Sequence, residues 1–520
     1  MTNNKKRSVV TVAFMILAMI VSKLLGMLRG VLLASSYGIT EEATAFSAAS
    51  RIPLSFFDIV FASAILGCFI PVYNSFSKDD GKGKNEFTSI YLNFMLLLTG
   101  AIALLGIIFA PTVLSVIAPD MLPETKLLAV KLLRIMFPLI VFAAASYTLV
   151  GVLQSNGKFI APAFISAVSN VLVIVYFLFF NKRFGISGLA VSYTLGWIVQ
   201  LLTLVFSLSR QEYSYKLLFN FKNKAFIKAL KLTPLIIMGS WLAPVCMLTS
   251  MRAALSTGIN GAVPSFEYSI NLFTVITGIT TYGICNYIFP ELSSLASGED
   301  ESGFLSTCKS GLSSSILMTV PISACVLALA PYAVCVIYKR GSFDVEAAEQ
   351  VTLILRALVP GMIGFTLTEV LSRVFYARKA PKYPVISVVV GIILNAVLSY
   401  TLCTALNFKL GALGLSYSAA ILGAGILMLV FAAVKMKGFF DFKYFLDFVK
   451  IILSGAVSAV VMYCICNWFG TNPYTDNIFE SILCAAVSAV FGIAVYFVLL
   501  VLMKEESFFT LYKKIIGKRG

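Results

Sequence analysis

The chain alternates between long apolar runs and short polar connections from one end to the other. Windows of about 19 residues separate about fourteen runs, each long enough for a helix to cross the hydrocarbon core of a bilayer. No connection is longer than about 20 residues, which is well short of a folded domain. We therefore predict an all-α, polytopic membrane protein with spans centred near residues 22, 58, 101, 140, 170, 197, 243, 278, 320, 362, 392, 424, 456 and 489.

The first run, residues 9–34, follows three basic residues at positions 5–7, as the core of a secretory signal peptide does. It is too long for such a core, and further spans follow it, so we expect no cleavage.

The first run also carries Lys23 and Arg29. A cation at that depth costs about 2.5–3.5 kcal/mol unless it faces a protein interior or a watery cavity. The alternative for Arg29 is that its long side chain reaches the far interface.

Small residues recur at every fourth position of the same run. They are Ser22, Gly26, Gly30 and Ala34. Such a stripe allows a neighbouring helix to approach closely. Because the two cations flank the stripe, we expect the first helix both to pack tightly and to line an interior.

Composition and charge agree with this class and give an orientation. Hydrophobic residues make up 59% of the chain, charged residues 12%, and the mean hydropathy is +0.93. The net charge of +16 indicates cytoplasmic loops rather than nucleic-acid binding. With the N-terminus inside, the inside connections hold about 23 Lys and Arg and the outside ones about 6, so both termini are expected in the cytoplasm. Lys182 and Arg183 outside, and the acidic loop at 299–301 inside, run against this bias.

Metal and redox chemistry have few residues to use. The chain has no histidine, and its ten cysteines lie mostly inside spans without a Cys-x-x-Cys pair, so we interpret them as small apolar side chains. We predict no metal site and no cofactor.

Gly151 to Lys158 resembles a phosphate-binding loop, but its spacing is one residue too long and Phe159 replaces the required Ser or Thr. Energy is therefore expected from the membrane potential, a gradient of Na⁺ or H⁺, or substrate flux.

The two halves of the chain repeat the same residue types at a nearly constant offset. Arg134 to Pro138 matches Arg356 to Pro360 at 222 residues, and Pro71 matches Pro290 at 219. Further matches follow in order: Ala110-Pro111 with Ala330-Pro331, Val152 and Pro162 with Val374 and Pro384, and Asn170 with Asn395. An even number of spans per repeat predicts two six-helix lobes related by an axis along the membrane normal.

The repeat divides the chain into four parts. Residues 1–222 are predicted as an N-terminal six-helix lobe and residues 223–440 as a C-terminal one. Residues 441–503 hold two extra transmembrane helices, and residues 504–520 a basic cytoplasmic tail. Transporters with parallel repeats bind their cargo between the lobes and expose it to each side in turn, so we expect alternating access.

Ionisable residues inside spans are the best candidates for a site. Arg51 and Asp58 lie seven residues apart on one face of the second span, where Asp58 is either a counter-charge or a coupling site for H⁺ or Na⁺. Glu369 and Arg373 are four apart with the acid first, which favours a helical ion pair that neutralises itself. The three candidates for ion coupling or counter-charge are therefore Asp58, Glu369 and Arg373.

Three cations lie in corresponding first helices of the two predicted lobes. Arg252 stands in Met-Arg-Ala-Ala-Leu, which is similar to Leu-Arg-Gly-Val-Leu around Arg29. Together with Lys23 they are predicted to converge on one cavity, where a guanidinium fork and an ammonium suit a pyrophosphate or a carboxylate. The candidate substrate-binding residues are Lys23, Arg29, Arg51 and Arg252.

Residues along essentially the whole chain match the motifs of one known family. They are Ser22 to Arg29, Tyr37-Gly38, Ala45-Phe46, Arg51 to Pro53, Phe69 to Pro71, Ala161 to Phe164 with Asn170, Gly261, Tyr268, Pro290, and Arg373 to Ala377 with Pro384. In these the chain resembles the MurJ (MviN) lipid II flippases of the multidrug, oligosaccharidyl-lipid and polysaccharide exporter superfamily.

The resemblance implies a cycle of inward-facing and outward-facing states that moves lipid II from the inner to the outer leaflet of the bacterial cytoplasmic membrane. The family's first-helix cations fall on Lys23 and Arg29, and spans thirteen and fourteen would form a groove for the polyprenyl tail. The expected role is in peptidoglycan biosynthesis and cell shape. The expected partners are lipid II, membrane lipids and cell-wall synthases, and the expected state is a monomer.

Several family positions carry other residues here. The acid near the start of the second span falls on Thr44, and the arginine of that span falls near Phe57. The arginine of the eighth span falls on Asn271. The acid of the seventh span is absent around Met251, which removes support for a sodium site carried over from the family.

These departures leave the cargo open. Another polyprenyl-pyrophosphate-linked saccharide, including a sporulation-associated precursor, would suit the same fold. A drug or cation antiporter would need cavity carboxylates, and Lys23 with Arg29 argues against it. A membrane-embedded transferase would need clustered acids or histidines at a membrane edge, and the sequence shows neither. We therefore expect a transporter rather than an enzyme.

Overall fold

The computed structural model describes residues 3–62, 65–77, 80–209, 213–297, 300–405, 408–439 and 441–509. Within these ranges the regular structure is helical and contains no strand, which confirms the predicted all-α fold. The helices gather into two compact units, Met1–Leu255 and Ser256–Gly520, which are described separately below.

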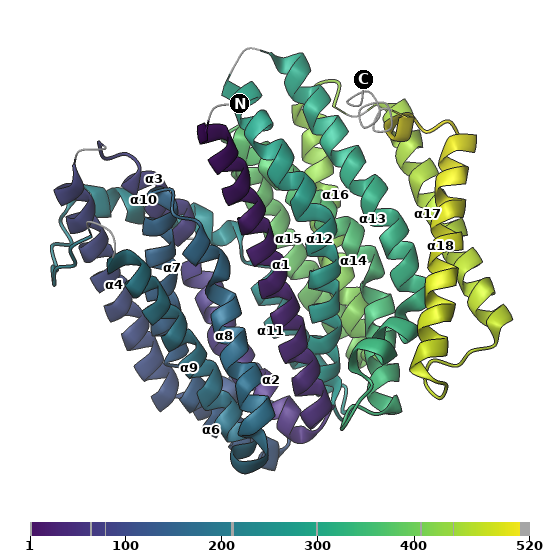
Figure 1. The fold of residues 1–520 in the computed structure, drawn as a ribbon, viewed down its shortest axis with the longest axis horizontal. Coiled ribbons are helices and arrows are strands. Elements are labelled where there is room, and N and C mark those ends of the chain that lie inside the picture. Colours follow the sequence, from purple (N-terminus) through teal and green to yellow (C-terminus); the bar gives the residue numbers. More distant parts are fainter. Residues whose placement is uncertain are drawn as a thin grey trace. The chain divides into compact units, whose positions relative to one another are not determined.

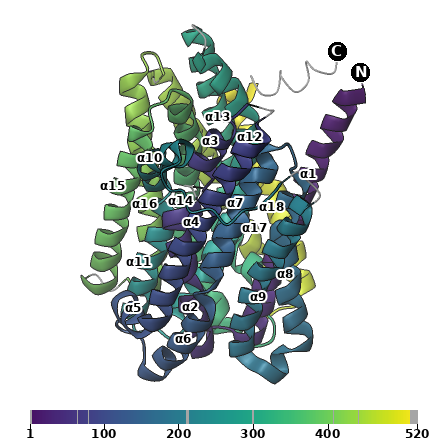
Figure 2. The ribbon, with the colours of Figure 1, turned by 90° about the vertical axis from the view of Figure 1, so that its left-hand side faces the viewer.

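The first unit begins with the long helix α1 (Figures 1 and 2). Its second span includes two short π-helices. Its elements are α1 (Asn3–Tyr37), α2 (Glu41–Phe57), η1 (Asp58–Ala62), η2 (Ile65–Phe69), α3 (Ile70–Tyr73), α4 (Gly81–Ile108), α5 (Ala110–Ile117), α6 (Pro123–Met136), α7 (Leu139–Ser155), α8 (Ile160–Phe179), α9 (Asn181–Ser209), α10 (Lys224–Gly239) and α11 (Leu242–Ser256).

The second unit consists mainly of long helices, and Figure 1 shows its last two, α17 and α18, side by side in yellow. Its elements are α12 (Ala262–Ser297), α13 (Glu301–Tyr338), α14 (Val345–Ala377), α15 (Lys382–Tyr400), η3 (Thr401–Ala405), α16 (Lys409–Lys435), α17 (Phe442–Phe469) and α18 (Ile478–Leu502). Asp300, Asp344 and Asp441 cap the starts of α13, α14 and α17 by accepting a hydrogen bond from the N–H three residues on.

Eleven helical stretches among the described residues are long and apolar enough to cross a membrane, and each coincides with a predicted span. The predicted spans near residues 58 and 243 fall on interrupted helices: α2 gives way to η1 at Asp58, and α10 and α11 are separated at Ser240 and Trp241. The span predicted near residue 278 falls on α12. The count of fourteen remains a prediction.

The small-residue stripe of the first helix packs as predicted. In Figure 2, α8 and α9 run side by side, and α8 also packs against α1. The Ser22 hydroxyl donates to the Ala163 carbonyl at 3.3 Å, and the Asn170 amide donates to the Ser22 carbonyl at 3.2 Å. A Cβ atom at Gly26 would lie 3.3 Å from Nδ2 of Asn170, so α8 approaches α1 at the stripe.

The second unit uses the same device between α14 and α16. A Cβ atom at Gly364 would lie 2.5 Å from the backbone nitrogen of Leu422, and one at Gly414 would lie 2.6 Å from the Ile354 carbonyl oxygen. Only glycine fits at such distances, so these two helices are in backbone contact.

The segment that joins the predicted lobes is attached to the first unit. The Asn93 amide of α4 donates to the carbonyls of Lys216 and Leu218, and the Tyr215 hydroxyl donates to the Asn93 side chain at 2.6 Å. Beyond it, α10 packs against α4, η1 and η2, so the contacts place it in the first unit. The predicted boundary at residue 222 concerns the repeat rather than these contacts, and it remains a prediction.

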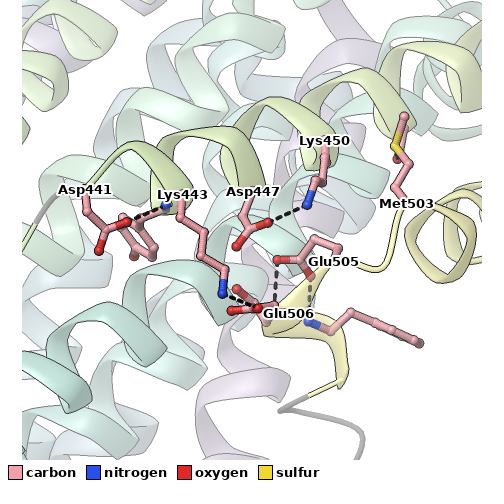
Figure 3. A network of polar contacts seen from close by, with 11 residues as sticks. Asp441, Lys443, Asp447, Lys450, Met503, Glu505 and Glu506 are labelled. Atoms are coloured by element: carbon pink, nitrogen blue, oxygen red, sulfur yellow. Dashed lines mark hydrogen bonds and ion pairs between the residues drawn. The ribbon is translucent and has the colours of Figure 1, made fainter.

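A polar network fastens the start of α17 and the chain after α18 (Figure 3). Lys443 pairs with Glu506 at 2.5 Å, and Lys450 pairs with Asp447 at 2.9 Å. The fully buried Glu505 accepts hydrogen bonds from the N–H groups of the second and third residues after it. The described start of the predicted tail is therefore bound to the second unit, and residues 510–520 lie outside the described residues.

Candidate functional site

The cations of the first helix lie on one element but have different surroundings. Lys23 is exposed on α1, and Arg29 is half-buried. The Arg29 guanidinium carbon lies 4.9 Å from the ring centroid of Tyr193 on α9, and that ring packs edge-on against Phe46 of α2. A cation over an aromatic face gains about 0.5–2 kcal/mol, more when desolvated. Three helices of the first unit therefore position Arg29.

The second span carries the predicted pair of opposite charges. Arg51 lies in α2, and Asp58 is the first residue of η1, with an exposed side chain. The two charges interact electrostatically, and Tyr147 of α7 is a further neighbour of the carboxylate. The structure therefore brings Arg51 and Asp58 together, and it leaves the choice between counter-charge and ion coupling as a prediction.

The π-helix at Asp58 is joined to the break between α10 and α11. The indole N–H of Trp241 donates to the Ile59 carbonyl at 2.8 Å. A π-helical turn displaces the regular i to i+4 hydrogen bonds, and such turns are frequent at functional sites. Two interrupted spans of the first unit thus contact each other where both are irregular.

Aromatic side chains pack beside this junction. Phe57 lies with its ring centroid 5.2 Å from that of Tyr147 and 6.5 Å from that of Trp197. These rings are hydrophobic, and Tyr147 also borders the Asp58 carboxylate. The site around Asp58 therefore combines one acid, one arginine and an aromatic wall.

Arg252 contacts another element of the first unit. Its side chain is exposed, and Nη1 donates to the Val116 carbonyl at 3.4 Å, near the C-terminal end of α5. A cation is favourable there because the last carbonyls of a helix carry partial negative charge. Arg29 contacts α9 and Arg252 contacts α5, so the convergence of Lys23, Arg29 and Arg252 remains a prediction.

The predicted ion pair of the second unit is confirmed. Nη1 of Arg373 lies 2.6 Å from Oε2 of Glu369 and also donates to the Glu369 backbone carbonyl at 2.8 Å. Both side chains are half-buried on α14. The pair neutralises itself within one helix turn, and its role in coupling remains a prediction.

The family positions that differ in this chain are filled by uncharged residues. Thr44 is buried and donates to the Thr40 carbonyl at 3.2 Å, while Phe57 and Met251 are buried. Asn271 is exposed on α12. No group of three metal-ligating side chains occurs among the described residues.

Sequence reasoning did not identify Tyr193 or Trp241. Both contact residues that are distant in the sequence, and local sequence patterns do not predict such contacts. The Gly239-Ser240 pair before Trp241 was a usable signal for a helix break, because glycine and serine weaken a helix interior.

A family model described as lipid II flippase MurJ matches residues 33–502. Two relatives cover nearly the full length. The probable lipid II flippase MurJ of Rickettsia prowazekii (strain Madrid E) is 23% identical over 491 residues, which is 94% of this chain and 96% of the relative. The lipid II flippase MurJ of Thermosipho africanus (strain TCF52B) is 25% identical over 481 residues, which is 92% and 93% of the two chains.

Solved structures show the same fold. A structure of lipid II flippase MurJ in an inward closed conformation aligns with a TM-score of 0.78 at 22% identity, over 94% of this chain and 98% of that one. An inward-facing multidrug resistance MATE family transporter of the MOP superfamily aligns with a TM-score of 0.69 at 14% identity, over 80% and 95%.

Proposed function

Because the chain belongs to the lipid II flippase MurJ family, we propose that it moves lipid II from the inner to the outer leaflet of the bacterial cytoplasmic membrane by alternating access. The family is one of transporters rather than enzymes. The match over residues 33–502 carries the proposal, and the names of the relatives from Rickettsia prowazekii and Thermosipho africanus support lipid II as the cargo.

Arg29 and Lys23 are the proposed contacts for the pyrophosphate of the cargo. Arg29 lies over Tyr193, which orients its guanidinium, and Lys23 adds an exposed ammonium on the same helix. Arg29 offers a planar fork of donors to phosphate oxygens, while Lys23 acts as a compact charge. Arg51 and Arg252 are proposed to extend this positive region as the cavity changes shape.

The driving force proposed for the cycle is the membrane potential or an ion gradient. One net charge that crosses the membrane is worth about 2.3 kcal/mol per 100 mV, so a potential that is negative inside favours outward movement of an anionic headgroup. Asp58 is the proposed site where H⁺ or Na⁺ would be coupled.

The polyprenyl tail is proposed to lie along α17 and α18, whose outer faces carry exposed apolar side chains, among them Val457, Val460, Val490 and Phe491. Both termini are proposed to be cytoplasmic. Synthases that consume lipid II on the outer side are the proposed partners, and the chain is proposed to act as a monomer.

The test is complementation of bacterial cells depleted of their own lipid II flippase. The wild-type chain is expected to restore growth and outer-leaflet lipid II. Arg29→Ala, at equal protein level, is expected to lower transport about 10- to 100-fold, since a charge-assisted contact is worth about 1.5–3 kcal/mol. Arg183→Ala is the matched control, because Arg183 is exposed and stacks on Phe184 of its own helix.

A second cargo is favoured by specific residues. Thr44, Phe57 and Asn271 replace three charged family positions, so the headgroup site differs from the pattern that the resemblance implies. Failure of a well-inserted protein to rescue would favour another polyprenyl-pyrophosphate-linked saccharide. Full transport by a Lys23→Ala, Arg29→Ala double variant would contradict the proposed pyrophosphate site itself.

A further inference from the structure

Three thiols gather at one end of the second unit, and the proposed transport does not use them. Cys466 of α17 and Cys484 of α18 are buried in one cluster, against which Cys325 of α13 packs. Cys464 is nearby in the sequence, but its side chain is exposed. The spacing of these cysteines in the sequence did not suggest that any two would meet.

The small residues between α17 and α18 bring the two helices into close contact. The Ser458 hydroxyl donates to the Gly492 carbonyl at 2.7 Å. A Cβ atom at Gly492 would lie 2.3 Å from Cε of Met462, so the helix surface at Gly492 accommodates the methionine side chain. Small residues at a helix interface allow this approach. Cysteine side chains one or two turns further along the same interface must therefore also lie close together.

A hydrogen bond directs the Cys466 thiol toward the face of α18 that carries Cys484. The Cys466 thiol lies 3.2 Å from the Ser488 hydroxyl. Ser488 follows Cys484 by four residues, so both occupy the same face of α18. Both thiols lie in the same buried cluster as Tyr332.

The loop that joins the two helices is held in place by α13. The Tyr332 hydroxyl donates to the Thr471 carbonyl at 3.0 Å, and the Lys339 ammonium donates to the Tyr474 carbonyl. These contacts fix the start and the middle of the short connection between α17 and α18. The facing cysteines are thus presented in a constrained hairpin.

We propose that Cys466 and Cys484 form a redox-sensitive pair that closes to a disulfide and joins α17 to α18 covalently. The two thiols lose two electrons and two protons as the S–S bond forms. The oxidant is a small organic disulfide, and its S–S bond is reduced to two thiols. In the predicted topology this end of the hairpin lies outside the cytoplasm, where disulfides persist.

Closure would remove the contact of the Cys466 thiol with Ser488 and restrict the movement of α17 against α18. Both thiols are buried, at 4% and 1% exposure, so the reaction requires a small oxidant and should be slower than mixed-disulfide formation at Cys464. This proposal does not depend on which cargo the protein carries.

The test treats the purified full-length chain with the small disulfide 4,4′-dithiodipyridine, alkylates the remaining thiols after unfolding, and maps the peptides by mass spectrometry. The expected product is a peptide pair joined between positions 466 and 484. Cys464→Ser should keep this cross-link, while Cys466→Ser and Cys484→Ser should each abolish it.

Two results would overturn the proposal: alkylation of both Cys466 and Cys484 after exhaustive oxidation, or a cross-link that joins Cys325 or Cys464 instead. The wild-type map is decisive by itself if a serine variant fails to fold. A transport assay on the oxidised protein is a separate experiment, so failure of the cross-link is distinguishable from failure of the proposed flippase activity.

Discussion

The second span of the first unit and α12 of the second unit correspond in the sequence repeat, yet they are built differently. The offset that relates Pro71 to Pro290, with up to two residues taken up by the π-helices, places the counterpart of Asp58 near Thr277. At Asp58 the α-helix changes to a π-helix and the carboxylate is exposed. Thr277 is buried within a continuous α12, and its hydroxyl donates to the Phe273 carbonyl at 2.7 Å.

The difference shows that corresponding regions of the two units place different demands on their surroundings. A threonine hydroxyl is satisfied by the preceding helical turn and makes few demands on its surroundings. A carboxylate in a membrane span requires a counter-charge, water or an ion. Arg51 and the irregular backbone next to Asp58 supply such surroundings in the first unit. We therefore place the ion-coupling hypothesis at Asp58 rather than at its counterpart.

The largest effect is expected from neutralising Asp58. Asp58→Asn should lower transport about 10- to 100-fold, because a contact with a charged group is worth about 1.5–3 kcal/mol. Thr277→Val, the matched change in the second unit, should leave transport within about twofold of the wild type at equal expression. A flippase assay in reconstituted vesicles measures both. Equal losses of transport in Asp58→Asn and Thr277→Val would contradict a special role for Asp58.

The contact between the two interrupted spans should matter for stability. Trp241→Phe keeps an aromatic ring but removes the donor to the part-buried Ile59 carbonyl, and such a hydrogen bond contributes about 0.5–1.5 kcal/mol. Trp468→Phe is the control, since Trp468 is 83% exposed on α17. Thermal unfolding in detergent should show a lower Tm for Trp241→Phe alone. A similar Tm for both variants would mean that the Trp241 hydrogen bond is dispensable.

The Glu369–Arg373 ion pair of α14 should contribute only modestly to the stability of the second unit. Glu369→Gln and Arg373→Gln are each expected to lower the free energy of unfolding by about 1 kcal/mol, because the pair is only half-buried and water screens part of the attraction. The double variant should cost less than the two single variants together. Strict additivity in the double-mutant cycle would show that the 2.6 Å contact contributes nothing.

The smallest effect concerns Asp441 at the start of α17. The Tyr444 N–H and the Lys309 ammonium hold the pKa of Asp441 below its usual value. A depressed pKa means that the contribution to stability is complete above pH about 4, the value for the unfolded chain, and disappears as the pH falls through the lower folded value.

The Tm difference between wild type and Asp441→Asn should therefore shrink as the pH is lowered from neutral toward 3. Asp120→Asn, at an exposed position between α5 and α6, is the control. A Tm difference for Asp441→Asn that grows with acidification would contradict the assigned direction of the pKa.

Local patterns predicted much of this molecule. The small-residue stripe of α1 and the Glu369–Arg373 pair follow from the helical period, since partners three or four residues apart share a face whatever the rest of the fold does. The all-α architecture follows from the length and apolarity of the runs. Family membership came from motifs spread over the whole chain.

The remaining features depend on contacts that no period encodes. Tyr193 meets Arg29, and Trp241 meets Ile59, only after distant helices have packed. Arg252 lies against the end of α5, although its sequence context is similar to that of Arg29. The meeting of Cys466 and Cys484 likewise requires the register between α17 and α18. The sequence could suggest which positions matter, but the residues that they contact became identifiable only from the packed helices.

The two π-helices also carry an evolutionary implication. A π-helical turn, with hydrogen bonds from residue i to i+5, contains one residue more than an α-helical turn. Each π-helix can therefore absorb a single-residue insertion. Arg29 and Pro71 are 42 positions apart, while their counterparts Arg252 and Pro290 are 38 apart. Two of the four additional residues are matched by η1 and η2, which lie within the longer interval. If the predicted repeat holds, insertion within a membrane span, rather than substitution alone, distinguishes the two halves of the chain.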